Sequence, residues 1–172
     1  MSGLEDLYRE IILDHYKSPR NQGRLESPPA TLEEGFNPLC GDEITVSVLL
    51  EDEIVTDVKI DGQGCSISKS SASLMSAAVK GKSLRQIATI VRTFKSMMSI
   101  PEDEAIPFVG PDDPSNASDP PILSEAEMGE LIALQGVVKF PVRIKCATLA
   151  WNTFSLALKK AQDAKIAPSE AP

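Results

Sequence analysis

The chain has 172 residues, of which 42% are hydrophobic, and a formal net charge of -8. This length fits one folded domain with its own core, and the acidic balance argues against nucleic acid as a partner while favouring a basic protein surface. No apolar run approaches the roughly 20 residues of a membrane span, and the N-terminus lacks the pattern of a signal peptide. We therefore expect a cytoplasmic protein that binds neither nucleic acid nor membranes.

The N-terminal part of the chain predicts a helix followed by strands. Apolar residues recur at helical spacing over residues 4–16, and turn-forming residues bracket a weaker strand pattern over residues 30–35. Apolar and polar residues then alternate over residues 44–50, and a second run covers residues 54–60. Because an acidic turn separates these two runs, they predict an antiparallel hairpin.

The remainder of the chain predicts helices with capping residues or glycines at their ends. They cover about residues 66–80, 84–98, 125–135 and 142–160. Residues 101–121 contain six prolines and six acidic residues but no lysine or arginine, which predicts an acidic surface insertion. We expect residues 1–163 to form a single domain and residues 164–172 to be a disordered tail.

Three cysteines, Cys40, Cys65 and Cys146, are an odd number that cannot form a complete disulfide set. They are either inert thiols of the core or groups for metal binding and sulfur chemistry. Each falls at a junction between predicted elements. The only histidine, His15, ends the first helix without a nearby partner of ligand type, and a lone histidine is more often structural.

These junctions favour a metal site. Cys40-Gly41-Asp42 opens the hairpin, and the glycine permits a tight turn that directs a thiolate and a carboxylate at one point. Cys65 begins the second helix and Cys146 lies in the first turn of the last, where free backbone N–H groups stabilise thiolates. We expect an α+β fold in which a small antiparallel β-sheet has helices packed mainly on one face, with the metal at one end of the sheet.

The ligand types suit zinc or an iron–sulfur cluster, and Asp42 is the best local candidate for a fourth ligand. Successive cysteines are 25 and 81 positions apart, which matches no local finger pattern, so the spacing alone is a weak signal. Arg143 and Lys145 add positive charge beside Cys146. Arg143 is either a solvated helix arginine or a partner for a ligand carboxylate or a bound persulfide.

Three segments around these residues resemble one known family. They are Asn-Pro-Leu-Cys-Gly-Asp at 37–42, Gly-Gln-Gly-Cys-Ser-Ile-Ser at 62–68 and Arg-Ile-Lys-Cys-Ala-Thr-Leu-Ala-Trp at 143–151. In this order they resemble the U-type scaffold proteins of iron–sulfur cluster assembly. The cluster-building members carry a histidine immediately before the last cysteine, whereas this chain has Lys145, which favours the SufU branch.

The resemblance implies a zinc-dependent sulfurtransferase that accepts persulfide sulfur from a pyridoxal-phosphate cysteine desulfurase, SufS, and increases its turnover. The SufBCD scaffold complex would lie downstream. The resemblance also implies zinc on Cys40, Asp42, Cys65 and Cys146, with Cys40 receiving the sulfur when a histidine of the desulfurase takes its place on the metal. Three thiolates and one carboxylate make such a site net negative, which gives the neighbouring basic residues an electrostatic role.

Two other functions use the same residues. A [2Fe–2S] cluster is assembled on the three cysteines if Asp42 serves as a labile ligand. Four protein ligands around zinc also suit a purely structural zinc domain. Metal content after anaerobic purification separates the first alternative from the sulfurtransferase, and activation of a desulfurase separates the second.

Overall fold

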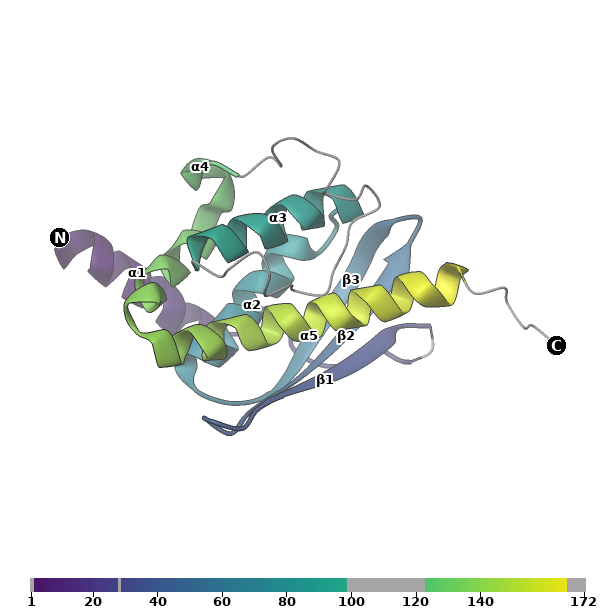
Figure 1. Cartoon of the computed structure of the whole chain (residues 1–172), viewed down its shortest axis with the longest axis horizontal. Helices are drawn as coiled ribbons and strands as arrows, with labels where there is room; N and C mark the ends of the chain where they lie inside the picture. The colour runs from purple at the N-terminus through teal and green to yellow at the C-terminus, as the bar shows by residue number, and fades with distance from the viewer. Residues whose placement is uncertain (1, 28, 99–122, 167–172) are drawn as a thin grey trace.

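The structure, a computed structural model, describes residues 2–27, 29–98 and 123–166 (Figure 1). A helix and three strands come first, and helices follow, in the order expected. The elements are α1 (Ser2–Lys17), β1 (Thr31–Asn37), β2 (Asp42–Glu51), β3 (Ile54–Gln63), α2 (Ser66–Val79), α3 (Leu84–Met97), α4 (Glu125–Met128), the 3-10 helix η2 (Gly129–Lys139) and α5 (Pro141–Ile166).

The three strands form one antiparallel sheet in the order β1-β2-β3. β2 and β3 are joined by the turn Asp52-Glu53, in which the two residues have φ angles of 50° and 63°. A two-residue turn with positive φ at both positions matches the right-handed twist of the strands that it joins. The structure therefore confirms the predicted hairpin and the additional strand before it.

Helices cover one face of the sheet, with α2 and α5 packed against the strands (Figure 1). On β2, Val46 and Val48 are fully buried in the core that these helices close. Thr45 and Ser47, which alternate with them, are polar, and the N–H of Leu25 donates to the Ser47 hydroxyl at 3.0 Å. This arrangement confirms the α+β fold with helices mainly on one face.

Two capping boxes fix the starts of helices. The Ser83 hydroxyl accepts the N–H of Gln86 at 3.2 Å, and the Gln86 side chain accepts the N–H of Ser83 at 2.9 Å, at the start of α3. Ser124 and Glu127 form the same arrangement before α4. A serine followed three positions later by glutamine or glutamate predicts both starts.

Two helix boundaries differ from the expectation. The helix capped by Ser124 is only four residues long, because Gly129 adopts φ 58° and ψ -131° and the chain continues as η2. The last helix includes Pro141 as its first residue, so Cys146 is its sixth residue and not a member of the first turn. Proline at the first helical position lacks only an N–H that would be free in any case.

The C-terminal end of the last helix also differs from the expectation. α5 continues to Ile166, three residues into the segment expected to be a disordered tail. The predicted acidic insertion at 101–121 and the tail from residue 167 lie outside the described residues, so the domain boundary at 163 stays a prediction.

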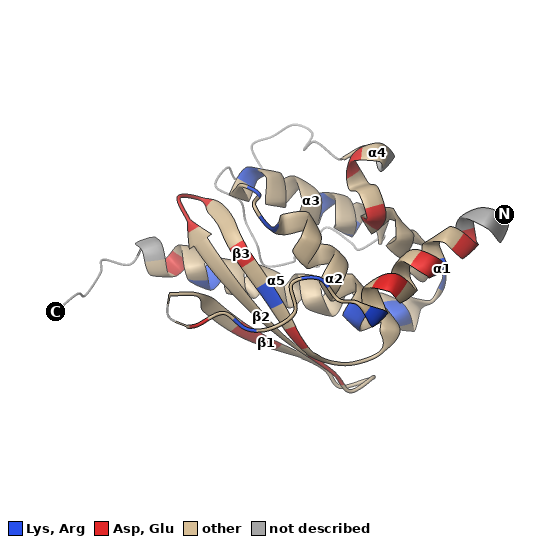
Figure 2. Cartoon of the chain, turned by 180° about the vertical axis from the view of Figure 1, so that it is seen from behind, with Lys and Arg blue, Asp and Glu red and all other residues tan. Residues whose placement is uncertain are grey.

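Charged side chains are distributed over several elements (Figure 2). Asp and Glu occur at the β2–β3 turn and along α1, and Lys and Arg are interspersed among them. In the part of the chain that the structure describes, no helix combines the length and the apolar character needed to cross a membrane.

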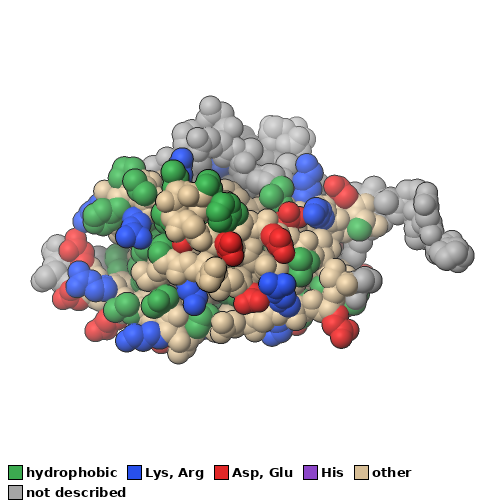
Figure 3. Space-filling view, turned by 90° about the horizontal axis from the view of Figure 1, so that it is seen from below, with side chains coloured by type: hydrophobic (Ala, Val, Ile, Leu, Met, Phe, Trp, Pro, Cys, Tyr) green, Lys and Arg blue, Asp and Glu red, His purple; other side chains and the backbone are tan. Residues whose placement is uncertain are grey.

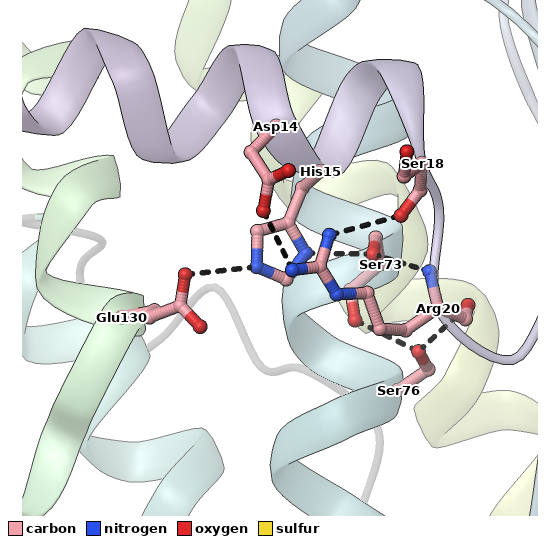
Figure 4. Close-up of polar contacts among 7 residues, drawn as sticks. All are labelled: Asp14, His15, Ser18, Arg20, Ser73, Ser76 and Glu130. Atoms are coloured by element: carbon pink, nitrogen blue, oxygen red, sulfur yellow. Dashed lines mark hydrogen bonds and ion pairs between the residues drawn. The ribbon is translucent and has the colours of Figure 1, made fainter.

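His15 on α1, which is 1% exposed, makes side-chain contacts with α2 and η2. Its Nδ1 lies 2.7 Å from Ser73 Oγ on α2, and its Nε2 lies 3.2 Å from Glu130 Oε2 on η2 (Figure 4). Ser73 Oγ accepts the N–H of Arg20 at 2.8 Å, so its own proton can be donated to Nδ1. A neutral imidazole with its proton on Nε2 satisfies all of these groups.

Candidate metal centre

The turn between β1 and β2 carries Cys40 at one end of the sheet. Asn37 pairs with Asp42 at the ends of the two strands, and residues 38–41 connect them. The N–H groups of Cys40 and Gly41 donate to the Asn37 carbonyl at 3.3 and 2.8 Å. Gly41 has φ 71°, a left-handed conformation that favours glycine. Cys40 is therefore exposed on a tight, hydrogen-bonded turn.

Asp42 and Cys65 meet at the start of α2. Asp42 is fully buried, and its Oδ1 accepts the N–H of Cys65 at 2.9 Å. Cys65 is the N-cap of α2, as expected: its Sγ accepts the N–H of Ser68 at 3.4 Å and lies 3.9 Å from Asp42 Oδ2. Gly64 permits this approach, because a Cβ at its position would lie 2.6 Å from Asp42 Oδ1.

Cys146 joins the group from α5. It is fully buried, and its Sγ lies 3.4 Å from Cys40 Sγ and 3.8 Å from the amide nitrogen of Asn37. The ligand atoms of Cys40, Asp42 and Cys146 all lie within 4.8 Å of one another. As the sixth residue of α5, Cys146 lies beyond the four free N–H groups at the helix start. The expected stabilisation by a helix N-terminus therefore applies to Cys65 and not to Cys146.

In the absence of a cation, Cys146 favours the thiol over the thiolate. Burial raises the pKa of the Cys146 thiol far above its usual range, and the neighbouring Cys40 and Cys65 thiols raise it further. A bound divalent cation has the opposite effect, because it ligates the deprotonated form. Metal binding here is therefore expected to release protons.

The donor atoms and their spacing fit zinc. Two sulfurs at the usual Zn–S distance of about 2.3 Å and a tetrahedral angle lie about 3.8 Å apart. The Cys40–Cys146 sulfur distance of 3.4 Å is close to that separation. Thiolates suit zinc better than magnesium or calcium, which prefer oxygen ligands. The Asn37 amide and the Cys65 N–H supply hydrogen bonds to Cys146 and Asp42 of the kind that orient metal ligands.

Arg143 and Lys145 have exposed side chains near the start of α5. Within the described residues, the side-chain contacts of Asp42 are with Cys65 and not with either basic residue. Arg143 is thus not paired with the Asp42 carboxylate, and its role as a partner for a bound persulfide stays a prediction. Both residues can still act on a net-negative centre through longer-range attraction.

Three residues that support the cluster received no role from the sequence. Asn37 contacts Cys146, and Gly64 makes room for the buried carboxylate. The Ser71 hydroxyl on α2 donates to the carbonyl of Ala147 on α5 at 2.6 Å. Asn37 and Gly64 lie inside segments that carry the family resemblance, so the resemblance could have identified them as residues of the site. Ser71 lies in a serine-rich helix whose pattern does not distinguish it from its neighbours.

Exposed apolar side chains adjoin the cluster. Phe36 and Leu39, 58% and 67% exposed, flank the turn that holds Cys40. Phe140 and Val142, 60% and 62% exposed, lie at the start of α5. Hydrophobic side chains gather toward one end of the face seen in Figure 3. We call these four residues the apolar rim; exposed apolar patches of this kind often mark protein interaction sites.

A second group of ligand-type side chains, Asp14, His15 and Glu130, lies where α1 meets η2 (Figure 4). The expectation that His15 has no such neighbour is therefore wrong. Both ring nitrogens of His15 are already hydrogen-bonded, and Asp14 is paired with Arg20 at 2.6 Å. The positive charge of the Arg20 guanidinium disfavours a metal cation at this position. The contacts of His15 therefore support the structural role expected for it.

Comparison with known proteins adds a family to this geometry. The NifU-like N terminal domain matches residues 7–107, which is more than half of the chain and includes Cys40, Asp42 and Cys65. The chain belongs to the NifU-like N-terminal domain family. The resemblance to U-type proteins, drawn from three short segments, is thereby confirmed.

Relatives of this NifU-like chain carry two kinds of name. It is 39% identical over 160 residues to the zinc-dependent sulfurtransferase SufU of Bacillus subtilis, covering 92% of this chain and 94% of that protein. It is 34% identical over 165 residues to the iron–sulfur cluster assembly scaffold protein IscU of Streptococcus pyogenes serotype M1. This match covers 96% of this chain and 91% of that protein. A crystal structure described as an iron–sulfur cluster assembly scaffold for the SUF system, FiSufU of Fervidobacterium islandicum AW-1, aligns with a TM-score of 0.68 at 30% identity, over 87% of this chain and 94% of that one. The fold is thus shared over most of the chain.

Proposed function

We propose that this chain is a zinc-dependent sulfurtransferase of iron–sulfur cluster assembly, which accepts persulfide sulfur from a pyridoxal-phosphate cysteine desulfurase of the SufS type and activates it. The observation that carries the proposal is the 39% identity to SufU of Bacillus subtilis over 92% of the chain. Lys145 supports it, because it replaces the histidine that cluster-building U-type proteins carry before the last cysteine. We place the reaction in the cytoplasm, where a reducing environment keeps the thiols free.

Cys40, Asp42, Cys65 and Cys146 are the proposed zinc ligands. The contacts among their side chains support this set, and the four residues come from the β1–β2 turn, the start of α2 and the body of α5. A bound zinc ion supplies positive charge that keeps the ligand thiols ionised. The exposed Arg143 and Lys145 offset part of the negative charge of the ligands.

Cys40 is the proposed sulfur acceptor. It is exposed, whereas Cys146 is buried and Cys65 is half-buried. A residue on a turn can leave its position at lower conformational cost than residues built into helices. Its departure leaves one coordination position to be filled, and we propose that a ligand from the desulfurase fills it, as the resemblance to the SufU branch implies. Docking then frees the Cys40 thiol at the moment when the donor persulfide arrives.

The apolar rim is the proposed docking site for the desulfurase. Phe36 and Leu39 lie next to Cys40 in sequence, and Phe140 and Val142 lie shortly before Cys146, so a partner that covers them brings its persulfide to Cys40. Exposed aromatic and aliphatic side chains are typical anchors of protein interfaces. The net charge of -8 favours a partner with basic residues around that contact. We propose the SufBCD complex as the later recipient of the sulfur.

The direct test mixes the zinc-loaded chain with a cysteine desulfurase and cysteine. We expect faster alanine production and one added sulfur atom on the peptide that contains Cys40. Cys40→Ala should abolish both while retaining some zinc, whereas Cys65→Ala and Cys146→Ala should lose zinc and stability together. If Cys40→Ala still accepts sulfur at the wild-type rate, with the persulfide on Cys146, the assignment of the acceptor is wrong.

A second function, a scaffold for a [2Fe–2S] cluster, is favoured by the 34% identity to IscU of Streptococcus pyogenes. The same cysteines and carboxylate would hold that cluster. Anaerobic purification distinguishes the two functions. A brown protein that contains iron and sulfide supports the scaffold, and a colourless protein that contains zinc supports the sulfurtransferase.

A further inference from the structure

Cys40 and Cys146 form a close pair of thiols in unlike environments. Their Sγ atoms are 3.4 Å apart, and Cys40 is exposed whereas Cys146 is buried. Cys65 has a separate role as the N-cap of α2, where its sulfur accepts the N–H of Ser68. A modest movement of the β1–β2 turn would bring the first pair to the S–S bond length of about 2.05 Å.

We propose that, in the chain without zinc, Cys146 discharges the persulfide on Cys40 and releases its outer sulfur as sulfide. This inference rests on the proposed function. The Cys146 thiolate attacks the inner sulfur of the Cys40 persulfide, the Cys40–Cys146 bond forms, and the bond to the outer sulfur breaks. The outer sulfur leaves as HS⁻ and takes up a proton. One persulfide and one thiol thus give one disulfide and one H2S, with no outside oxidant or reductant.

The environments of the two sulfurs favour this direction of attack. Because Cys40 is exposed and Cys146 is buried, an outer sulfur on Cys40 can extend toward solvent, which is the position required of the leaving group. The 3.4 Å separation of the two sulfurs also favours the attack, because well-oriented groups in one molecule react as if present at about 10⁵ M or more.

Zinc occupancy then determines what happens to the accepted sulfur. A Cys146 thiolate held by zinc is a weaker nucleophile, so the persulfide on Cys40 persists until an acceptor protein takes the sulfur. In the chain without zinc, the same persulfide is lost as sulfide, and the disulfide prevents another cycle until an external thiol reduces it. Zinc would therefore protect the accepted sulfur as well as control the release of Cys40.

The experiment loads the reduced metal-free full chain with sulfur from inorganic polysulfide, without any desulfurase, and removes the excess by rapid desalting. Zinc is returned at once to one of two samples. Both samples are then followed by free sulfide and by intact and peptide mass, at a temperature where the near-ultraviolet signal of the buried Trp151 is retained. The metal-free chain should release sulfide equal to its bound sulfane sulfur and end two hydrogen atoms lighter than the reduced chain, with Cys40 linked to Cys146. The zinc-loaded chain should stay one sulfur atom heavier.

Variants identify the attacking thiol. Cys146→Ser and Cys146→Ala should each release sulfide more than about tenfold more slowly than the metal-free wild type, because the intramolecular nucleophile is gone. Gly136→Ala is the control, since nothing lies within 4 Å of a Cβ built there and the reacting pair is intact. The proposal is overturned if the metal-free wild type keeps its persulfide, if both Cys146 variants release sulfide at the wild-type rate, or if the disulfide joins Cys40 to Cys65. Because polysulfide replaces the desulfurase, a failure here is distinct from a failure to activate that enzyme.

Discussion

At the scale of single residues, the buried Asp42 carboxylate depends on a glycine that has no chemistry of its own. Gly64 lies so close to Asp42 that a Cβ at its position would be 2.6 Å from Oδ1. This Cβ would clash with the Asp42 side chain and disturb the hydrogen bond that Oδ1 accepts from the Cys65 N–H. A single methyl group at this position therefore tests how strictly the cluster is arranged.

Gly64→Ala should weaken zinc binding, because the added methyl displaces the Asp42 carboxylate from the cluster. We expect a loss in zinc affinity of about 10-fold or more, the size found when the surroundings of metal ligands are altered. Competition with a fluorescent zinc chelator measures this change. Gly136→Ala is the matched control, since nothing lies within 4 Å of a Cβ built there. Equal zinc affinities in the two variants would contradict the role assigned to Gly64.

His15 should make the metal-free chain less stable in acid. Burial lowers the pKa of His15, and the positive charge of Arg20 lowers it further. The carboxylates of Glu130 and Asp14 oppose this shift without reversing it. The folded state therefore binds a proton on His15 less readily than the unfolded state does. Its stabilising contribution is therefore complete above the unfolded pKa of about 6.5 and is lost as the pH falls from there through the folded pKa.

Urea unfolding of the metal-free chain at about pH 7.5 and about pH 5.5 measures the effect of His15. The free energy of unfolding should fall less between the two pH values in His15→Gln than in the wild type. Using the metal-free chain removes the contribution of acid-induced zinc release. An equal fall in both proteins would show that His15 does not contribute to the acid sensitivity.

At the scale of elements, α2 and α5 are joined by polar contacts beside the cluster. The Ser71 hydroxyl donates to the Ala147 carbonyl and accepts the indole N–H of Trp151 at 3.1 Å. The indole also stacks on Phe94, with ring centroids 4.1 Å apart. Small serine side chains let the two helices approach, and the hydroxyl of Ser71 accepts the indole N–H that Trp151 would otherwise bury without a partner.

Ser71→Ala should destabilise the fold by about 1–3 kcal/mol, because it leaves the buried indole N–H of Trp151 without an acceptor. Ser70→Ala is the control, since the equally buried Ser70 hydroxyl donates to Ser66 within its own helix and satisfies no group of α5. Urea unfolding of both variants measures the difference. A Ser71 variant no less stable than the Ser70 variant would argue against this link.

The elements also mark how far the sequence could predict the fold. Alternating strands and the capping box at Ser83 depend on residues close together in the chain, so local patterns predict them. The end of α4 at Gly129 and the start of α5 at Pro141 coincide with local features, the positive φ of Gly129 and a proline at the first helical position, and helical periodicity alone placed both incorrectly. The contact between His15 and Glu130 spans 115 positions and has no local signal. The candidate metal site was predicted from the position of its cysteines at element junctions together with motif context, because the spacing of the cysteines alone is uninformative.

At the scale of the whole molecule, the proposed zinc ligands join segments that are distant in the chain. The β1–β2 turn, the start of α2 and the body of α5 meet at one end of the sheet, while the hydrophobic core lies between the sheet and the helices. A metal ion at this position would restrain the end of the domain, whereas the core would hold the remainder.

Removing zinc should therefore lower the melting temperature without unfolding the chain at room temperature. Structural zinc contributes about 10–16 kcal/mol of apparent binding energy in peptides that have no other core, and a domain with its own core should depend on it less. A melting scan with and without chelator, with zinc measured in each sample, tests this prediction. If protein verified to be metal-free had the same melting temperature as the zinc-loaded protein, the ion would have no structural role.

The position of Cys146 on the last helix has a consequence for the newly made chain. Cys40, Asp42 and Cys65 are synthesised 81 or more positions before Cys146. At about 5–20 residues per second, the ribosome leaves an interval of roughly 4–16 s in which two thiols and a carboxylate have been translated without the fourth ligand. During that interval the nascent chain has an incomplete set of the proposed ligands, which competing metals and oxidants can reach. Correct filling of the proposed zinc site therefore waits until α5 has been synthesised.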